Sequence, residues 1–165
     1  MRLIRTVLGL TFGLFIFSAI VSAIVAAVTK QRLASTGSET DDEFDLVTIF
    51  DGLEFASTAP ALRRATALTW YGGSTLDLRG ATLDPAGAQL NVRTVFGGLQ
   101  VIVPETWRVS QHVMPILGGV DDTRDQDAVD PSAPLLSVDG WAVFGGFAIT
   151  SEPFDLEAPM AAATA

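Results

Sequence analysis

Glycine pairs recur at near-regular intervals along the chain, and this repetition constrains the fold more than any other feature of the sequence. Five segments align without gaps: TIFDGLEFA, LTWYGGSTLDL, RTVFGGLQVIV, MPILGGVDD and WAVFGGFAIT. The last glycines of these segments are Gly52, Gly73, Gly98, Gly119 and Gly146, at intervals of 21, 25, 21 and 27 residues. Periods of 20–50 residues are typical of solenoids and arrays, in which each repeat buries its apolar face on its neighbour.

A bulky side chain precedes each of these glycine motifs. These residues are Phe50, Tyr71, Phe96, Leu117 and Phe144. The position three residues after the bulky one is apolar in four repeats, and Ser74 is the exception. Alternation along a strand places Val95, Leu99 and Val101 on one face. In coils stacked in register, the last glycines form a ladder that makes room beside the bulky side chains or lets the chain turn a corner.

These patterns predict an all-β domain over residues 46–152, a β-solenoid of about five coils in which the five glycines are structural. They predict that a larger side chain at Gly98 clashes within the ladder. The alternative is a β-sandwich in which the glycines lie in hairpin turns. One stretch, residues 59–68, is either a short helix or a loop.

An apolar N-terminal segment predicts a membrane anchor over residues 1–30. Thr6 to Val28 are 23 consecutive uncharged residues, which span roughly 34 Å as a helix and cross a bilayer core. A cleaved signal peptide is the alternative, but the apolar part of such peptides is usually about 7–15 residues long. Gly9 and Gly13 form a GxxxG spacing that lets two membrane helices approach closely. The basic side chains before the helix favour a soluble domain outside the cytoplasm.

Charge divides sharply after the predicted anchor. Residues 1–32 carry four basic side chains and no acidic ones, whereas the other 133 residues carry all 19 acidic side chains and six arginines, a net charge of −13. Such a surface repels nucleic acid and predicts that the folded part stands off anionic lipid headgroups. The absence of cysteine excludes disulfides, cysteine-based zinc sites and thiol catalysis. Residues 31–45 are predicted to be an acidic flexible linker and residues 153–165 a disordered tail.

The combination of VFGG, VPETWRV, GGVDDTR and a second VFGG resembles the C-terminal domain of the LiaF-type cell-wall-active antibiotic response proteins. The resemblance covers about residues 70–150. It implies a membrane-attached, β-solenoid-like domain that senses or regulates envelope stress through protein contacts, without catalysis. The chain departs from the family's best-studied type in having one predicted membrane helix rather than several, and in having Thr106 where glycine is usual.

Four groups of residues are candidates for chemistry. The aspartates between Asp121 and Asp130 are expected to form a solvated loop, with a calcium site as the alternative. Glycan hydrolysis by paired carboxylates is a distant alternative, for which the acids would be Asp77, Asp84 and Asp122. His112 is the only histidine, which leaves no pattern for a Ser-His-Asp triad. The three tryptophans are expected in the core, with a sugar-stacking platform as the alternative; they are Trp70, Trp107 and Trp141.

The sequence therefore predicts a single-pass, membrane-anchored interaction or regulatory module that is not an enzyme. We expect no cofactor and no metal. The expected partner is another envelope or membrane protein, and dimerisation through the membrane helix is a further expectation. The alternatives are a membrane-tethered scaffold that associates with itself and, more distantly, a glycan-binding or glycan-cleaving β-helix.

Overall fold

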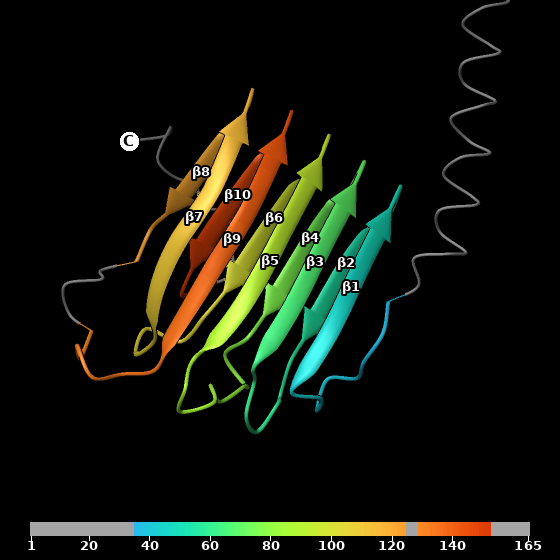
Figure 1. Ribbon diagram of the computed structural model, residues 1–165. Helices are drawn as coiled ribbons and strands as arrows, with labels where there is room; N and C mark the ends of the chain where they lie inside the picture. Colours follow the sequence, from blue (N-terminus) through green and yellow to red (C-terminus); the bar gives the residue numbers. More distant parts are fainter. Residues whose placement is uncertain (1–34, 125–128, 153–165) are drawn as a thin grey trace, which may run out of the picture. The chain divides into compact units, whose positions relative to one another are not determined.

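The computed structural model describes residues 35–124 and 129–152, and these residues contain strands but no helix (Figure 1). The prediction of an all-β domain is therefore confirmed. The strands are β1 (Glu43–Ile49), β2 (Gly52–Ala56), β3 (Arg64–Trp70), β4 (Gly73–Asp77), β5 (Ala88–Val95), β6 (Gly98–Ile102), β7 (Arg108–Ile116), β8 (Gly119–Asp122), β9 (Leu135–Val143) and β10 (Gly146–Thr150).

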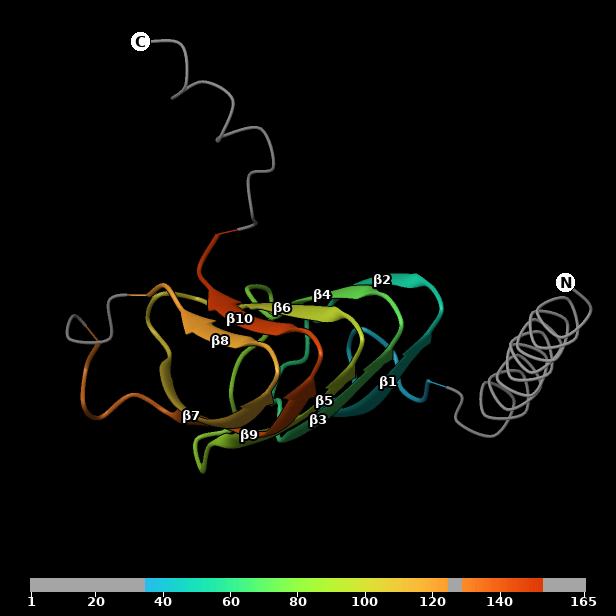
Figure 2. The same ribbon diagram turned by 90° about the horizontal axis from the view of Figure 1, so that it is seen from above.

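Each repeat contributes one strand to each of two parallel sheets. The first sheet has the order β1-β3-β5-β9-β7 and the second has the order β2-β4-β6-β10-β8. Figure 2 shows the two sheets as opposite layers joined by the chain at each glycine pair. The two strands that flank a glycine pair belong to different sheets, so the alternative of hairpin turns is wrong.

The fifth repeat lies between the third and the fourth. Strand β9 pairs with β5 on one side and β7 on the other, and β10 pairs with β6 and β8. Gly140 in β9 accommodates this position, because a Cβ there would overlap the backbone carbonyl of Val92 in β5. The partners of Gly140 in register are Val92 and Val113, so the glycine is particular to the inserted strand.

The core lies between the two sheets. Val92 and Val138 face inward from the first sheet, and Val101 and Ile149 from the second; none of the four is exposed to solvent. Burial of such side chains contributes about 1.5–3 kcal/mol each. Because the neighbouring repeats supply the facing side chains, no repeat has a core of its own.

The two ends of the stack are closed in different ways. The rings of Phe44 and Phe55 pack 4.9 Å apart at the β1/β2 end. At the β7/β8 end, Asp122 is in register with inward-facing Ile149 and accepts two hydrogen bonds from the guanidinium of Arg124, of 2.9 and 2.8 Å, and a third from its backbone N–H. Arg124 also donates to the carbonyl of Trp107. A polar terminal repeat of this kind caps a stack rather than extending it.

At the corner between the sheets, the bulky residue of every repeat has left-handed backbone geometry, with φ between 49° and 54°. Strand alternation therefore does not continue through the glycine pair. Thr94 is buried before the corner and Leu99 and Val101 after it, whereas Val95 is half-buried on the outer face. The prediction that Val95 shares a face with Leu99 is wrong, because Phe96 turns the chain between them.

The first glycine of each pair lies against the neighbouring repeat. A Cβ on Gly97 would overlap the carbonyl oxygen of Gly72, and the same holds for Gly72 against Asp51, Gly145 against Gly97 and Gly118 against Gly145. Each missing Cβ thus points toward the β1/β2 end. Asp51 occupies this position in the terminal repeat, which has no neighbour on that side, so a side chain fits there.

The second glycines form the ladder that the repeats predict, but they are not crowded. Gly52, Gly73, Gly98, Gly146 and Gly119 are successive partners in register. A Cβ on Gly98 would meet only the carbonyl oxygen of Gly146, at 3.9 Å, which is ordinary contact. The predicted clash at Gly98 is wrong, since the close approach occurs one residue earlier.

The β unit begins before the predicted boundary at residue 46. Strand β1 starts at Glu43 and Thr36 bridges Asp45, so residues 35–45, which were expected to belong to the linker 31–45, are part of the β unit. Residues 59–68 form a loop and most of β3 rather than a helix. In the described part of the chain no helix is long and apolar enough to cross a membrane, and residues 6–28 and 153–165 lie outside it.

Ser74, the polar exception among the repeats, belongs to a buried hydroxyl cluster. Its Oγ donates to Thr48 Oγ1 at 3.0 Å and accepts from Thr69 Oγ1 at 2.9 Å. All three side chains are buried. A serine thus satisfies two hydroxyls where the other repeats place an apolar side chain.

We expect opposite effects from alanine at the two glycines of the third repeat. Gly97→Ala forces the backbone of adjacent repeats apart and is expected to lower the free energy of unfolding of residues 35–165 by about 3 kcal/mol. Gly98→Ala enters open space and is expected to be neutral or stabilising by up to about 1 kcal/mol. Urea denaturation followed by circular dichroism measures both. Equal losses for the two variants would contradict the assignment.

Ser74→Ala is expected to lower the free energy of unfolding by about 1–2 kcal/mol, because the buried hydroxyls of Thr48 and Thr69 lose their partner. The same denaturation measurement applies. A stability equal to that of the unchanged domain would show that the cluster contributes nothing.

Candidate interaction surface

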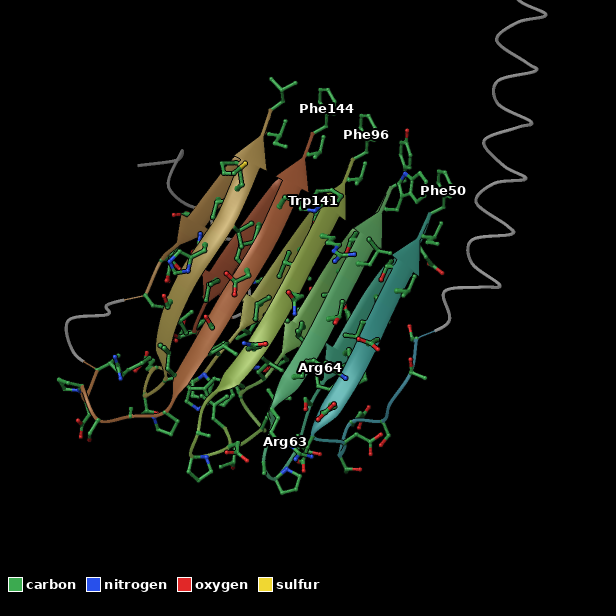
Figure 3. The ribbon with its side chains drawn as sticks, viewed as in Figure 1. Phe50, Arg63, Arg64, Phe96, Trp141 and Phe144 are labelled. Carbon is green, nitrogen blue, oxygen red and sulfur yellow. The ribbon has the colours of Figure 1, made fainter. Side chains whose placement is uncertain are left out.

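The five bulky corner residues form an exposed ladder, which we call the aromatic corner: Phe50, Tyr71, Phe96, Phe144 and Leu117. The four rings stack in this order with centroids 4.8–4.9 Å apart and planes within 12° of parallel. Their exposed fractions are 40–54%, and that of Leu117 is 73%. Figure 3 shows Phe50, Phe96 and Phe144 beyond one end of the strands, with Arg63 and Arg64 at the other.

The backbone of the corner does not need aromatic side chains. The N–H of Phe96 donates to the carbonyl of Val143 at 2.9 Å, and the other three ring-bearing residues make the equivalent bond to the next repeat. Left-handed geometry costs a residue with a Cβ about 1–2 kcal/mol, whereas glycine and asparagine adopt it readily. Ring stacking offsets this by about 0.5–1.5 kcal/mol per pair. Exposed rings at positions that favour glycine therefore indicate a role beyond the turn.

Two rows on the outer face of the first sheet extend this apolar surface, and we call them the outer rows. Strand pairing aligns Trp70, Val95, Val143 and Ile116 in the row next to the corner, and Leu68, Arg93, Trp141 and Met114 in the row below. Met114 and Ile116 are exposed, and Trp141 is half-buried on this face (Figure 3). Asp51 and Arg93 are the only charged residues among the bulky corner residues, the two residues that follow each of them, and the outer rows.

Most of the negative charge lies away from the corner. Fifteen acidic residues and six arginines are described, and Asp51 is the one acid at the corner. Asp77 is the last residue of β4 and Arg79 follows shortly after it. Hydrogen bonds from Arg79 hold the pKa of the Asp77 carboxyl below its usual value. Hydrogen bonds from Ser132 likewise lower the pKa of Asp130. The β unit thus has an aromatic edge with few charged residues and an acidic opposite end.

The carboxylates considered for glycan cleavage are not brought together. Asp77 ends β4 and Asp122 ends β8, and β6 and β10 lie between these strands, which separates them by roughly 14 Å at the usual strand spacing. Each pairs with its own arginine, and Asp84 accepts a hydrogen bond from the N–H of Ala86 in a loop.

The remaining candidates for chemistry are also dispersed. Within residues 35–124 and 129–152 no group of three or more potential ligands is placed to hold a metal ion. Two of the loop aspartates, Asp125 and Asp127, lie outside these residues, as do Gly9 and Gly13. His112 is exposed on β7 with Asp139 as its partner in register.

The tryptophans do not form a platform. Trp107 is buried in the core, as expected, whereas Trp70 and Trp141 lie in different outer rows. The exposed corner was not predicted from the sequence, although a bulky residue stands before every glycine motif. Its exposure depends on the left-handed turn, which periodicity does not report.

A shallow groove of about 520 Å³ adjoins the corner on the outer side of the second sheet. Its floor contains Gly73, Gly98, Gly146 and Gly119, so it follows the uncrowded glycines across four strands. The small side chains leave the sheet backbone open to solvent, but the groove contains no buried charged group that would select a ligand.

Comparisons with known proteins add no assignment: no family model matches the chain, and no curated protein or solved structure shows significant similarity to it.

We expect Phe96→Asn to change the free energy of unfolding by less than about 1 kcal/mol, because relief of the left-handed strain offsets the lost stacking. Phe147→Asn is the matched control, because this buried ring lies in the core and its loss is expected to cost about 3–5 kcal/mol. Urea denaturation of residues 35–165 compares the two. A large loss for Phe96→Asn would mean that the ladder serves folding alone.

Proposed function

We propose that the chain is a membrane-anchored, non-catalytic interaction or regulatory module, built as a β-solenoid of five coils behind one transmembrane helix. The observation that carries this proposal is the aromatic corner. Its rings are exposed in a backbone geometry that favours glycine. Exposed contiguous apolar surface marks contact with a protein or a membrane.

The closed ends of the β unit favour a regulator over a scaffold that stacks end to end. At one end Thr36 pairs with Asp45 along the edge of β1, and the Phe44 ring packs on Phe55. At the other end the Asp122–Arg124 pair occupies the inward-facing position, with side-chain exposures of 14% and 3%. Stacking two copies would have to displace these groups, and the net negative charge opposes it at low salt.

The regulatory assignment rests on the resemblance to the LiaF-type proteins. In this proposal the β unit lies outside the cytoplasm, contacts another envelope or membrane protein, and takes part in the response to envelope stress. The face containing Gly9 and Gly13 pairs the membrane helices of two copies or of a copy and its partner.

We expect residues 33–165 to be monomeric at micromolar concentration, because both ends of the stack are capped. Light scattering after size-exclusion chromatography measures the mass. The double variant Asp122→Ala/Arg124→Ala is the comparison, since it removes the polar cap and is expected to associate. Filaments or large oligomers of the unchanged fragment would favour the scaffold instead.

A further inference from the structure

The chain enters the β unit beside the aromatic corner. The N–H of Val47 donates to Ser35 Oγ at 3.0 Å, and Val47 lies three residues before Phe50. Thr36 and Asp45 exchange two antiparallel backbone hydrogen bonds of 2.8 and 2.9 Å. From Thr36 to Ser35 the segment therefore runs toward the corner end of β1, which places Ser35, the first described residue, on the corner side of Thr36.

The predicted membrane segment ends only a few residues earlier. Residues 29–34 separate Val28 from Ser35, and six extended residues span at most about 20 Å. A helix that crosses the bilayer over residues 6–28 therefore holds Ser35 near the membrane surface. The corner, about three residues further along β1, lies within reach of the same surface.

The chemistry of this edge suits the boundary between lipid headgroups and acyl chains. Aromatic side chains concentrate at that boundary, where their amphipathic rings are accommodated. Tyr71 adds a hydroxyl within the stack, and Trp70 and Trp141 lie in the outer rows just below. Arg93 is placed in the second row, where a long basic side chain extends toward lipid phosphates.

We propose that the aromatic corner docks on the lipid surface and holds the β unit in one orientation, with its acidic end away from the bilayer. This inference rests on the proposed membrane anchor. It modifies the expectation that the folded part stands off the membrane: the net charge of the unit is negative, but Asp51 is the only acidic residue among the five bulky corner residues and the two residues that follow each of them. The repulsive groups and the apolar edge are separated in space.

The test uses the full chain, whose lack of cysteine gives an introduced thiol a unique label. Phe96→Cys places a nitrobenzoxadiazole fluorophore at the corner, and Glu105→Cys places it in an exposed loop beyond the far end of β6. Both proteins are reconstituted in phosphatidylcholine vesicles, with and without a lipid that carries a doxyl quencher near its headgroup. We expect the label at position 96 to shift to the blue and lose most of its emission to the quencher, and the label at position 105 to do neither.

A second variant separates docking from a general proximity to the bilayer. Phe50→Asn and Phe144→Asn, added to the Phe96→Cys protein, remove two rings while keeping a residue that tolerates the left-handed turn. Quenching at position 96 is expected to fall to the level of the Glu105→Cys control, with an unchanged circular dichroism spectrum.

Three outcomes would overturn the inference. A blue shift at position 96 without quenching means that protein, either a second copy or the chain's own N-terminal segment, covers the corner instead of lipid. If the protein floats with the vesicles but the label at position 96 is neither shifted nor quenched, the membrane anchor is supported and the docking of the corner is contradicted. Protein that does not float with the vesicles overturns both the anchor and the docking that depends on it.

Discussion

The close approach of the first corner glycine to the neighbouring backbone is the constraint on which the stack depends. At Gly72, Gly97, Gly118 and Gly145 a Cβ would overlap a carbonyl oxygen of the adjacent repeat. Because these glycines lack a Cβ, each repeat can turn from one sheet to the other while its backbone stays close to that of the adjacent repeat. The hydrogen bond from the N–H of Gly98 to the carbonyl of Gly72 then continues the parallel ladder through the corner. In the terminal repeat Asp51 stands in place of the glycine, because there a Cβ points away from the stack and meets no neighbouring repeat.

The same turn explains why the surface is polarised. Left-handed geometry at the residue before the glycines directs its side chain outward, so five repeats build a continuous exposed ladder from Phe50 to Leu117. The opposite ends of the strands carry the loops, and with them most of the carboxylates and their arginine partners, such as Asp77 with Arg79. An apolar edge and an acidic end on one unit are consistent with the membrane-tethered interaction module proposed above, whereas an end-to-end scaffold requires open coil faces.

Periodicity predicted the repeats, the all-β fold and the pairing of Gly52, Gly73, Gly98, Gly119 and Gly146, because these follow from residue types at fixed spacing. It failed at the corner. Strand alternation, continued through the glycine pair, placed Val95 on the same face as Leu99. The glycine ladder was likewise expected to be crowded at Gly98. Both predictions were wrong because residue spacing does not reveal the left-handed backbone of Phe96. The N-terminal boundary was also set too late, because residues 35–45 are mostly polar and join the β unit through backbone hydrogen bonds such as those between Thr36 and Asp45, which hydrophobicity does not indicate.

By itself the sequence determined how many strand pairs the chain contains and which residues occupy equivalent positions, because these properties are local and each repeat carries them. Tertiary structure alone decided the order in which the repeats lie. Gly140 permits β9 to approach β5 closely, and the fifth repeat is thereby placed between the third and the fourth. Tertiary structure also decided which apolar residues remain exposed. Phe147 and Phe144 lie three residues apart and are both phenylalanine, yet one is in the core and the other in the ladder, because the left-handed turn at Phe144 directs its ring outward whereas Phe147 faces the opposite sheet.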